Sequence, residues 1–259
     1  MFFLVALAVF WVNKNRYYLS SFVVLFAAFL KLFPILAAVS LLRAEKKFFF
    51  RLFCIVCAVF AVYLAVTFHD LILIGKGTPK SAYFSFGKDV LWMKAFEINE
   101  SLGMFFKYFS YFVLAICAVS AIFLFFKKSI PIRFEESITL DSFRAGAMIY
   151  IGTFLLGSNF IYRLMFLILV IPQLLVWMQS LSGKYKIFSF AAFFSALWLL
   201  HGPMISKIMR FFSDHIRIVR YFMFFIDDIF AWVLFVLLLF FICNDVGTKV
   251  RKEFILHSL

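Results

Sequence analysis

The sequence GAMIYIGTFLLGSNFIYRLMFLILVIPQLLVWM, residues 146–178, decides the class of fold. It reads as an apolar helix that breaks at the small, polar turn of residues 157–159 and restarts with Tyr162 and Arg163 at the head of a second apolar helix. A guanidinium in hydrocarbon costs about 2.5–3.5 kcal/mol on insertion scales, so it needs a compensating partner or the headgroup region. Arg163 is therefore a candidate contact for an anion.

The composition of the whole chain points to a membrane location. Of its 259 residues, 66% are hydrophobic and 22% aromatic, and Phe alone contributes 42. A water-soluble domain has too little interior to bury that fraction of apolar side chains. The net charge of +13 is scattered over many loops, which indicates membrane topology and argues against nucleic-acid binding. We therefore expect an all-α, polytopic integral membrane helix bundle.

Apolar runs predict about nine membrane segments, because a bilayer core of about 30 Å needs roughly 20 apolar residues per spanning helix. Residues 48–68, 108–126 and 221–243 are unambiguous spans. Shorter runs cross only if they are tilted or sheltered by neighbours, which indicates helices that line an internal cavity. These runs are residues 2–12, 17–30, 32–42, 145–156, 164–178 and 187–200.

The first apolar run is a poor signal peptide, because no basic region precedes it and no small-residue cleavage site follows it. We therefore expect residues 1–259 to form one transmembrane domain that begins partway through a longer membrane protein.

The distribution of Lys and Arg predicts the orientation. If the segments alternate, one side holds 15 basic residues in about 55 positions and the other 11 in about 70, and the denser side is expected to be cytoplasmic. This arrangement places the C-terminus inside, with Arg163 and the loop of residues 69–107 on the extracytoplasmic side.

A second cation stands at a break in an apolar stretch. Residues 31–34 read Lys-Leu-Phe-Pro, and the proline predicts a turn or kink because it removes a backbone donor and disfavours helix before it. Lys31 either snorkels to the interface or lies beside an anionic ligand. It falls on the same predicted side as Arg163.

The loop of residues 69–107 is the longest connection, and it carries several acids. Most such carboxylates are simply solvated, but one in a membrane-side cavity can act as a general base. Asp70, just past the end of a span, is the candidate catalytic residue.

Three further patterns bear on structure. Residues 203–220 are amphipathic with a basic face, which predicts an interfacial helix. Asp227 and Asp228 open the last span and need a cation such as Arg217 or Arg220, unless they line a polar cavity. The pair of cysteines at residues 54 and 57 has no further Cys or His nearby, so we predict no metal site and no cofactor.

The chain resembles the GT-C superfamily of membrane glycosyltransferases, nearest the polyprenyl-phosphate-mannose-dependent alpha-mannosyltransferase-like family. One motif is Lys31-x-x-Pro34, which is closed by a basic run at residues 43–47. The other is Gly-Ser-Asn-Phe-Ile-Tyr-Arg-Leu from residue 157, followed by Ile-Pro-Gln-Leu-Leu from residue 171. The resemblance covers residues 17–180.

The resemblance implies a site on the extracytoplasmic side, in a membrane such as the bacterial cytoplasmic (inner) membrane, where a polyprenyl-phosphate sugar donor meets basic residues at helix ends. Lys31 and Arg163 are then phosphate contacts, supported by Asn159 and Tyr162. The family's catalytic acid follows its first span, yet no carboxylate precedes Glu45 here. The chain is thus similar to the later portion of such an enzyme, and we expect activity to need an N-terminal companion segment.

Two rival classes stay open. Broken helices and intramembrane charges also mark transporters and flippases, although no internal repeat relates the two halves of the sequence. A non-catalytic membrane scaffold is the third hypothesis. Membrane lipid is a partner under all three. The sugar, the acceptor and the oligomeric state do not follow from the sequence.

Overall fold

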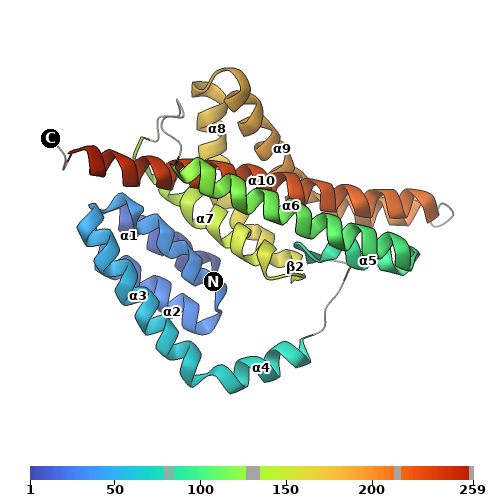
Figure 1. Ribbon diagram of the computed structural model, residues 1–259, viewed down its shortest axis with the longest axis horizontal. Coiled ribbons are helices and arrows are strands. Elements are labelled where there is room, and N and C mark those ends of the chain that lie inside the picture. Colours follow the sequence, from blue (N-terminus) through green and yellow to red (C-terminus); the bar gives the residue numbers. More distant parts are fainter. Residues whose placement is uncertain (79–81, 83–84, 127–134, 213–216, 257–259) are drawn as a thin grey trace.

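The computed structural model describes residues 1–78, 82, 85–126, 135–212 and 217–256 (Figure 1). Within these ranges the chain is all-α, as the composition predicts, apart from two strands of two residues each. The elements are α1 (Phe2–Asn13), α2 (Tyr17–Leu30), the 3-10 helix η1 (Phe33–Arg43), α3 (Lys46–Val66), α4 (Phe68–Gly77), β1 (Ser85–Phe86), α5 (Val90–Ile98), α6 (Glu100–Phe126), α7 (Ile138–Leu155), β2 (Asn159–Phe160), the 3-10 helix η2 (Ile161–Leu169), α8 (Ile171–Ser180), α9 (Gly183–Phe212) and α10 (Arg217–Leu256).

Three helices among the described residues are long and apolar enough to cross a membrane: Lys46–Val66 in α3, Glu100–Phe125 in α6 and Phe225–Lys249 in α10. The pair η2 and α8 adds a fourth span if it is counted as one broken helix. Nine spans are not confirmed, because α1, α2 and η1 are apolar but shorter, at 12, 14 and 11 residues.

Prolines stand at two main breaks; the sequence predicts the break at Pro34, whereas residues 164–178, expected as one segment, divide into η2 and α8. Pro34 stands in the first turn of η1, directly after the break at Lys31, and Pro172 stands in the first turn of α8. The axes of η2 and α8 differ by 46°, because proline disfavours helical backbone in the preceding residue and lacks an N–H for the helix that would otherwise continue.

The amphipathic stretch of residues 203–220 is not a separate helix. Its first ten residues prolong α9 to Phe212, its last four begin α10 at Arg217, and residues 213–216 lie outside the described residues. The expected interfacial position of this stretch stays a prediction.

Helix α7 is the centre of the bundle, and most of its residues are buried. One face carries Phe143, Tyr150 and Phe154 into a core shared with α8, α9 and α10. Another carries Ala145 and Ile149 into a second core shared with α1, η1 and η2. Small residues permit this packing, as in membrane helix pairs generally: a Cβ at Gly146 would lie 2.7 Å from the carbonyl oxygen of Phe166 in η2.

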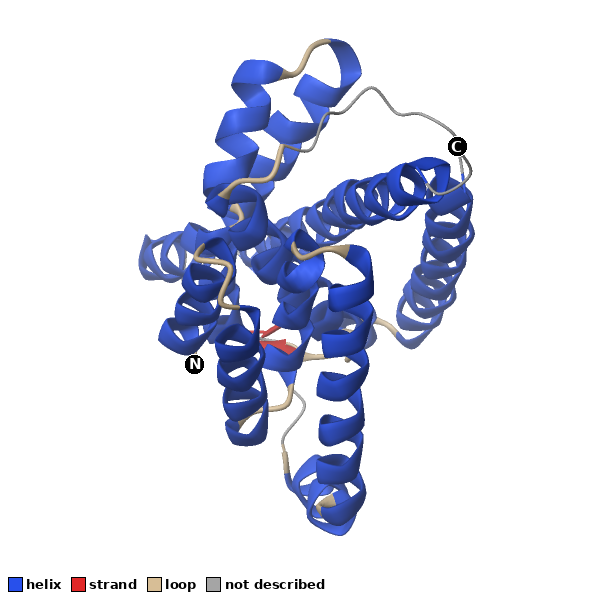
Figure 2. Cartoon of the chain, turned by 90° about the vertical axis from the view of Figure 1, so that its left-hand side faces the viewer, coloured by secondary structure: helices blue, strands red, loops and turns tan. Residues whose placement is uncertain are grey.

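The helices surround α7 in three groups. Figure 1 shows α6 and α10 side by side along the longest axis, with α1 to α4 on one side of them and α8 and α9 on the other. Figure 2 shows the strands near the middle of the molecule, where β1 pairs antiparallel with β2. That pairing fixes the start of α5 against the C-terminal end of α7.

The orientation is open to a direct test. After replacement of the four native cysteines, we expect Ser101→Cys to react with a membrane-impermeant thiol reagent in intact cells, and Ser180→Cys to react only once the inner face is opened. Both serines are exposed, and the predicted topology puts them on opposite sides of the membrane. The reverse labelling pattern would invert the topology, and with it the predicted side of Arg163.

Candidate functional site: a cation cluster at the broken helix

The structure brings together the four residues that the sequence proposes for ligand binding. The Lys31 ammonium donates to the hydroxyl of Tyr162, with Nζ and Oη 3.2 Å apart, and lies 4.7 Å from the centre of its ring. Arg163 donates from Nη1 to Oδ1 of Asn159 and from Nε to the Tyr162 hydroxyl at 3.4 Å. We call Lys31, Asn159, Tyr162 and Arg163 the cation cluster.

Asn159 anchors the cluster to the end of α7. It is buried, and its amide Nδ2 donates to the carbonyl oxygen of Thr153 in the last turn of that helix. Gly157 makes the turn between them with a φ of +107°, a conformation that side chains other than glycine rarely adopt. The guanidinium of Arg163 also lies over the ring of Phe33, 5.1 Å from its centre. Phe33 belongs to the first turn of η1, so this helix also helps to position Arg163.

The two cations have no acidic partner among the described residues. Their polar contacts there are with Tyr162 and Asn159, both neutral. Lys31 and Tyr162 are exposed, and Arg163 is half-buried. Two positive charges that share one hydroxyl, next to buried aromatic surface, attract an anionic phosphate group more strongly than either cation alone.

Asp70 is not part of this arrangement. It is exposed in the first turn of α4, and Figures 1 and 2 both place α4 at the far end of α3, away from β2. The reason is that the chain stays helical through α4 instead of folding back after the span, so a position just past the span ends up remote from the turn that carries Arg163.

A different carboxylate, Asp89, lies beside that turn. The backbone N–H of Lys88 donates to the carbonyl oxygen of Phe154 at 3.0 Å, which closes the end of α7. Oδ1 of Asp89 accepts from Lys88 Nζ at 2.7 Å and from Trp92 Nε1 at 3.1 Å. Its Oδ2 rests on Gly157, where a Cβ would lie 2.6 Å away. The β1–β2 pairing and the backbone bond from Lys88 bring Asp89 here, and two-residue strands leave no clear sequence signal.

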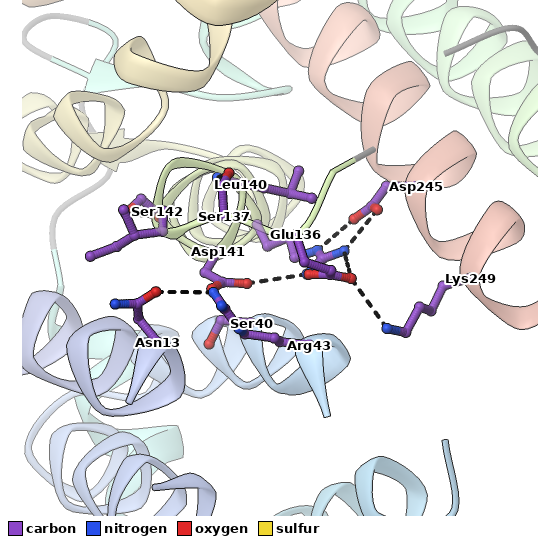
Figure 3. A network of polar contacts seen from close by, with 12 residues as sticks. Asn13, Ser40, Arg43, Glu136, Ser137, Leu140, Asp141, Ser142, Asp245 and Lys249 are labelled. Carbon is purple, nitrogen blue, oxygen red and sulfur yellow. Dashed lines mark hydrogen bonds and ion pairs between the residues drawn. The ribbon is translucent and has the colours of Figure 1, made fainter. Parts of the chain in front are cut away.

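A second polar cluster occupies the opposite end of α7 (Figure 3). Arg144 is fully buried, and its Nε and Nη2 donate to the two carboxylate oxygens of Asp245 at 2.7 and 2.9 Å. Its Nη1 lies 2.8 Å from Glu136 and 3.2 Å from Asp141.

This charge network extends to two further cations. Arg43 pairs with Asp141 at 2.6 Å, and Lys249 pairs with Glu136 at 3.2 Å. The network as defined therefore balances three cations, Arg43, Arg144 and Lys249, against three carboxylates, Glu136, Asp141 and Asp245. Balanced, hydrogen-bonded charges of this kind tie segments together, here η1, α7 and α10.

The two acids that open the last span also find partners. Asp228 pairs with Lys94 of α5 at 2.8 Å, and both side chains are almost completely buried. Asp227 accepts from Trp198 Nε1 at 2.9 Å. Lys94 therefore supplies the cation that Asp228 needs. The side chains of Arg217 and Arg220, which the sequence suggests for this role, lie outside the described residues.

Glu136 makes the charge network sensitive to acid. Burial raises the pKa of Glu136, but hydrogen bonds and positive charge from Arg144 and Lys249 outweigh burial and hold that pKa below its usual range. The stability that this carboxylate contributes is therefore present above its unfolded pKa of about 4.3 and is lost as the pH falls through the lower folded value.

We accordingly expect the melting temperature of Glu136→Gln to lie below that of the wild type at pH 6, and the gap to narrow as the pH is lowered towards 3. Thermal unfolding in detergent across this range measures it. A gap that stays constant from pH 6 to pH 3 would show that the Glu136 charge does not contribute as described.

The described chain is thus all-α, with several helices long and apolar enough to span a membrane and a polar cluster at each end of α7. Among the described residues no group of three or more His, Cys, Asp or Glu is placed to hold a metal ion. No protein family, curated protein or solved structure matches the chain.

Proposed function

We propose that the protein binds a polyprenyl-phosphate sugar through the cation cluster and takes part in transferring the sugar to an acceptor on the extracytoplasmic side of a membrane such as the bacterial cytoplasmic membrane. One observation carries the proposal. Lys31 and Arg163 are remote in sequence, yet both contact the hydroxyl of Tyr162, and no described acid neutralises them. This arrangement suits a phosphate that bridges the two cations.

The position of the cluster favours a phosphate attached to a lipid. Lys31 follows an apolar helix and Arg163 heads another. The ring of Tyr162 contacts both cations, and the ring of Phe33 contacts Arg163. A water-soluble anion would reach these cations from the aqueous phase and would make no use of the apolar surface around them. A lipid-linked phosphate would place its hydrocarbon against the exposed apolar side chains nearby, such as Phe29 and Leu30.

In the proposed reaction an acceptor hydroxyl forms a bond to the anomeric carbon of the sugar, and the bond from that carbon to the phosphate oxygen breaks. The bonding pair leaves with the polyprenyl phosphate, where Lys31 and Arg163 stabilise the growing negative charge. The hydroxyl proton passes to a base. Asp89, beside the same turn, is better placed for that role than Asp70.

Ligand-dependent stability tests the proposal. We expect polyprenyl-phosphate mannose to raise the melting temperature of the purified chain, and polyprenyl phosphate to do so in part, because a ligand bound only by the folded state stabilises it by about 2.7 kcal/mol at a hundredfold excess over Kd. Polyprenol, which lacks the phosphate, serves as the control. Equal protection by polyprenol, or protection by a nucleotide sugar alone, would contradict the proposal.

One observation favours transport as the second candidate. Helices η2 and α8 form an apolar pair bent by 46°, and broken helices next to charged groups are typical of transport pathways. Movement of a labelled polyprenyl-phosphate sugar across proteoliposomes without any transfer to an acceptor would favour a flippase.

A further inference from the structure

Helix α4 leaves the end of an exposed candidate span and has no buried residue of its own. In α3 the buried residues are Leu52 and Val56, and α4 begins directly after the single residue Thr67. None of the ten residues of α4 is buried. Figures 1 and 2 show that α4 turns sharply from the axis of α3 and projects from the rest of the bundle. Packing within the described chain therefore does not explain the position of α4.

The sequence of α4 is amphipathic. At 100° per residue, most of its apolar positions fall within an arc of about 160°, and its charged residues lie on the remainder. The apolar arc consists of Phe68, Leu71, Ile72, Ile74 and Gly75. Phe68 and Ile74 are 63% and 62% exposed, and Leu73 lies among the polar residues of the opposite arc. A short helix with one uncovered apolar face is typical of a membrane interface.

The length of α3 places α4 at the surface of the bilayer. At 1.5 Å per residue, the 21 residues of α3 extend over about 32 Å, and a bilayer core is about 30 Å thick. Because α3 is long and apolar enough to span a membrane, its last turn is expected at the headgroup region. A helix that turns away there with an apolar face runs along the membrane surface.

The cation cluster lies near the same end of α3. The hydroxyl of Tyr63 donates to the carbonyl oxygen of Phe29 at 3.0 Å, and the centres of their rings are 4.8 Å apart. Phe29 stands two residues before Lys31, and Tyr63 stands three residues before Val66, the last residue of α3. Three residues correspond to about 5 Å along the helix. The backbone next to Lys31 is therefore about one helical turn from the level of α4.

We propose that α4 lies in the headgroup region of the membrane, with Phe68, Ile72 and Ile74 among the acyl chains, and that it thereby holds the cation cluster close to the depth of lipid phosphates. The partner of this face is the lipid surface. The position of α4 does not depend on the function proposed for the cation cluster, so each can be tested without the other.

Spin labels measure the depth of α4 in the whole chain, reconstituted into phospholipid nanodiscs. Single cysteines replace Leu30, Ile55, Ile72 or Leu73, all of them exposed, in a background without native cysteines. We expect oxygen, which concentrates in hydrocarbon, to relax the Ile72→Cys label several-fold more than a water-soluble nickel chelate does. The matched Leu73→Cys label should show the reverse. The Leu30→Cys label should lie within about 5 Å of the depth of Ile72→Cys, and the Ile55→Cys label should lie deeper than both.

A labelling measurement on the wild type does not depend on the folding of any variant. A phospholipid with a photoreactive group next to its glycerol ester should label residues 68–77, whereas one with the group at the end of its acyl chain should label the middle of α3. Three results would overturn the proposal: greater access of the nickel chelate at both residues 72 and 73, which places α4 in water; protection of residue 72 from both reagents, which indicates a partner protein or a second copy of the chain; or a Leu30→Cys label as deep as Ile55→Cys.

Discussion

Replacing Arg144 with alanine is expected to lower the free energy of unfolding by about 3–5 kcal/mol, the largest effect of any single charge among the described residues. Arg144 is fully buried and contacts three carboxylates, of Asp245, Glu136 and Asp141. Without it, Asp141 keeps Arg43, but the buried carboxylate of Asp245 loses both of its hydrogen bonds to Arg144. An unpaired buried carboxylate costs far more than the pair contributed.

Denaturant unfolding in a mixed micelle, followed by tryptophan fluorescence, measures this loss. Lys249→Ala is the matched control, because Lys249 belongs to the same network but is partly exposed and bonds only Glu136; its expected effect is below about 1 kcal/mol. Arg144→Lys should fall between the two, since an ammonium cannot reproduce the bidentate contact with Asp245. An Arg144→Ala protein as stable as the Lys249→Ala protein would show that the network does not hold the bundle together.

Gly87→Ala is expected to have the second large effect, and it acts through the backbone. Gly87 has a φ of +132°, and a Cβ there would lie 1.7 Å from the carbonyl oxygen of Gly157. The β1–β2 contact must therefore open. The strained conformation costs about 1–3 kcal/mol and the overlap about 1–3 kcal/mol more. Because this contact positions the turn before Arg163, ligand protection should fall together with stability.

Gly75→Ala is the control for Gly87→Ala. Gly75 lies within α4, where a Cβ would meet nothing within 4 Å, so alanine should be neutral or stabilise the helix slightly. The melting temperatures of both variants, with and without polyprenyl phosphate, make the comparison. Equal behaviour of the two variants would mean that the close approach of Gly87 to Gly157 does not matter for the fold.

Local sequence signals predicted much of the secondary structure. The apolar run of residues 17–30 matches α2, and the prolines at residues 34 and 172 stand where helices restart. These features are local: they depend on the length of an apolar run and on the missing N–H of a proline, both of which can be read from adjacent residues. The 3-10 geometry of η1 and η2 was missed, because hydropathy does not distinguish it from an α-helix.

Features built from distant residues could not be predicted in the same way. Arg144 and Asp245 lie at opposite ends of a long stretch of sequence, and nothing local to either shows that α7 and α10 bring them together. In the sequence nothing distinguishes Asp89 from the other acids of its loop; the β1–β2 pairing is what places it against Gly157. The prediction that Lys31 and Arg163 share one site, supported by Tyr162, came from a family resemblance and a predicted side of the membrane. In the structure both cations contact the Tyr162 hydroxyl.

The most direct test of the central claim is a double-mutant cycle on Lys31 and Arg163, read out as the affinity for polyprenyl phosphate in nanodiscs. If both cations contact one phosphate, Lys31→Ala and Arg163→Ala should each weaken binding by at least tenfold, and the double variant should lose clearly less than the product of the two. Arg163→Lys should also weaken binding, because the guanidinium fork is lost. Unchanged affinity in both single variants, or strictly multiplicative losses, would contradict a shared phosphate site.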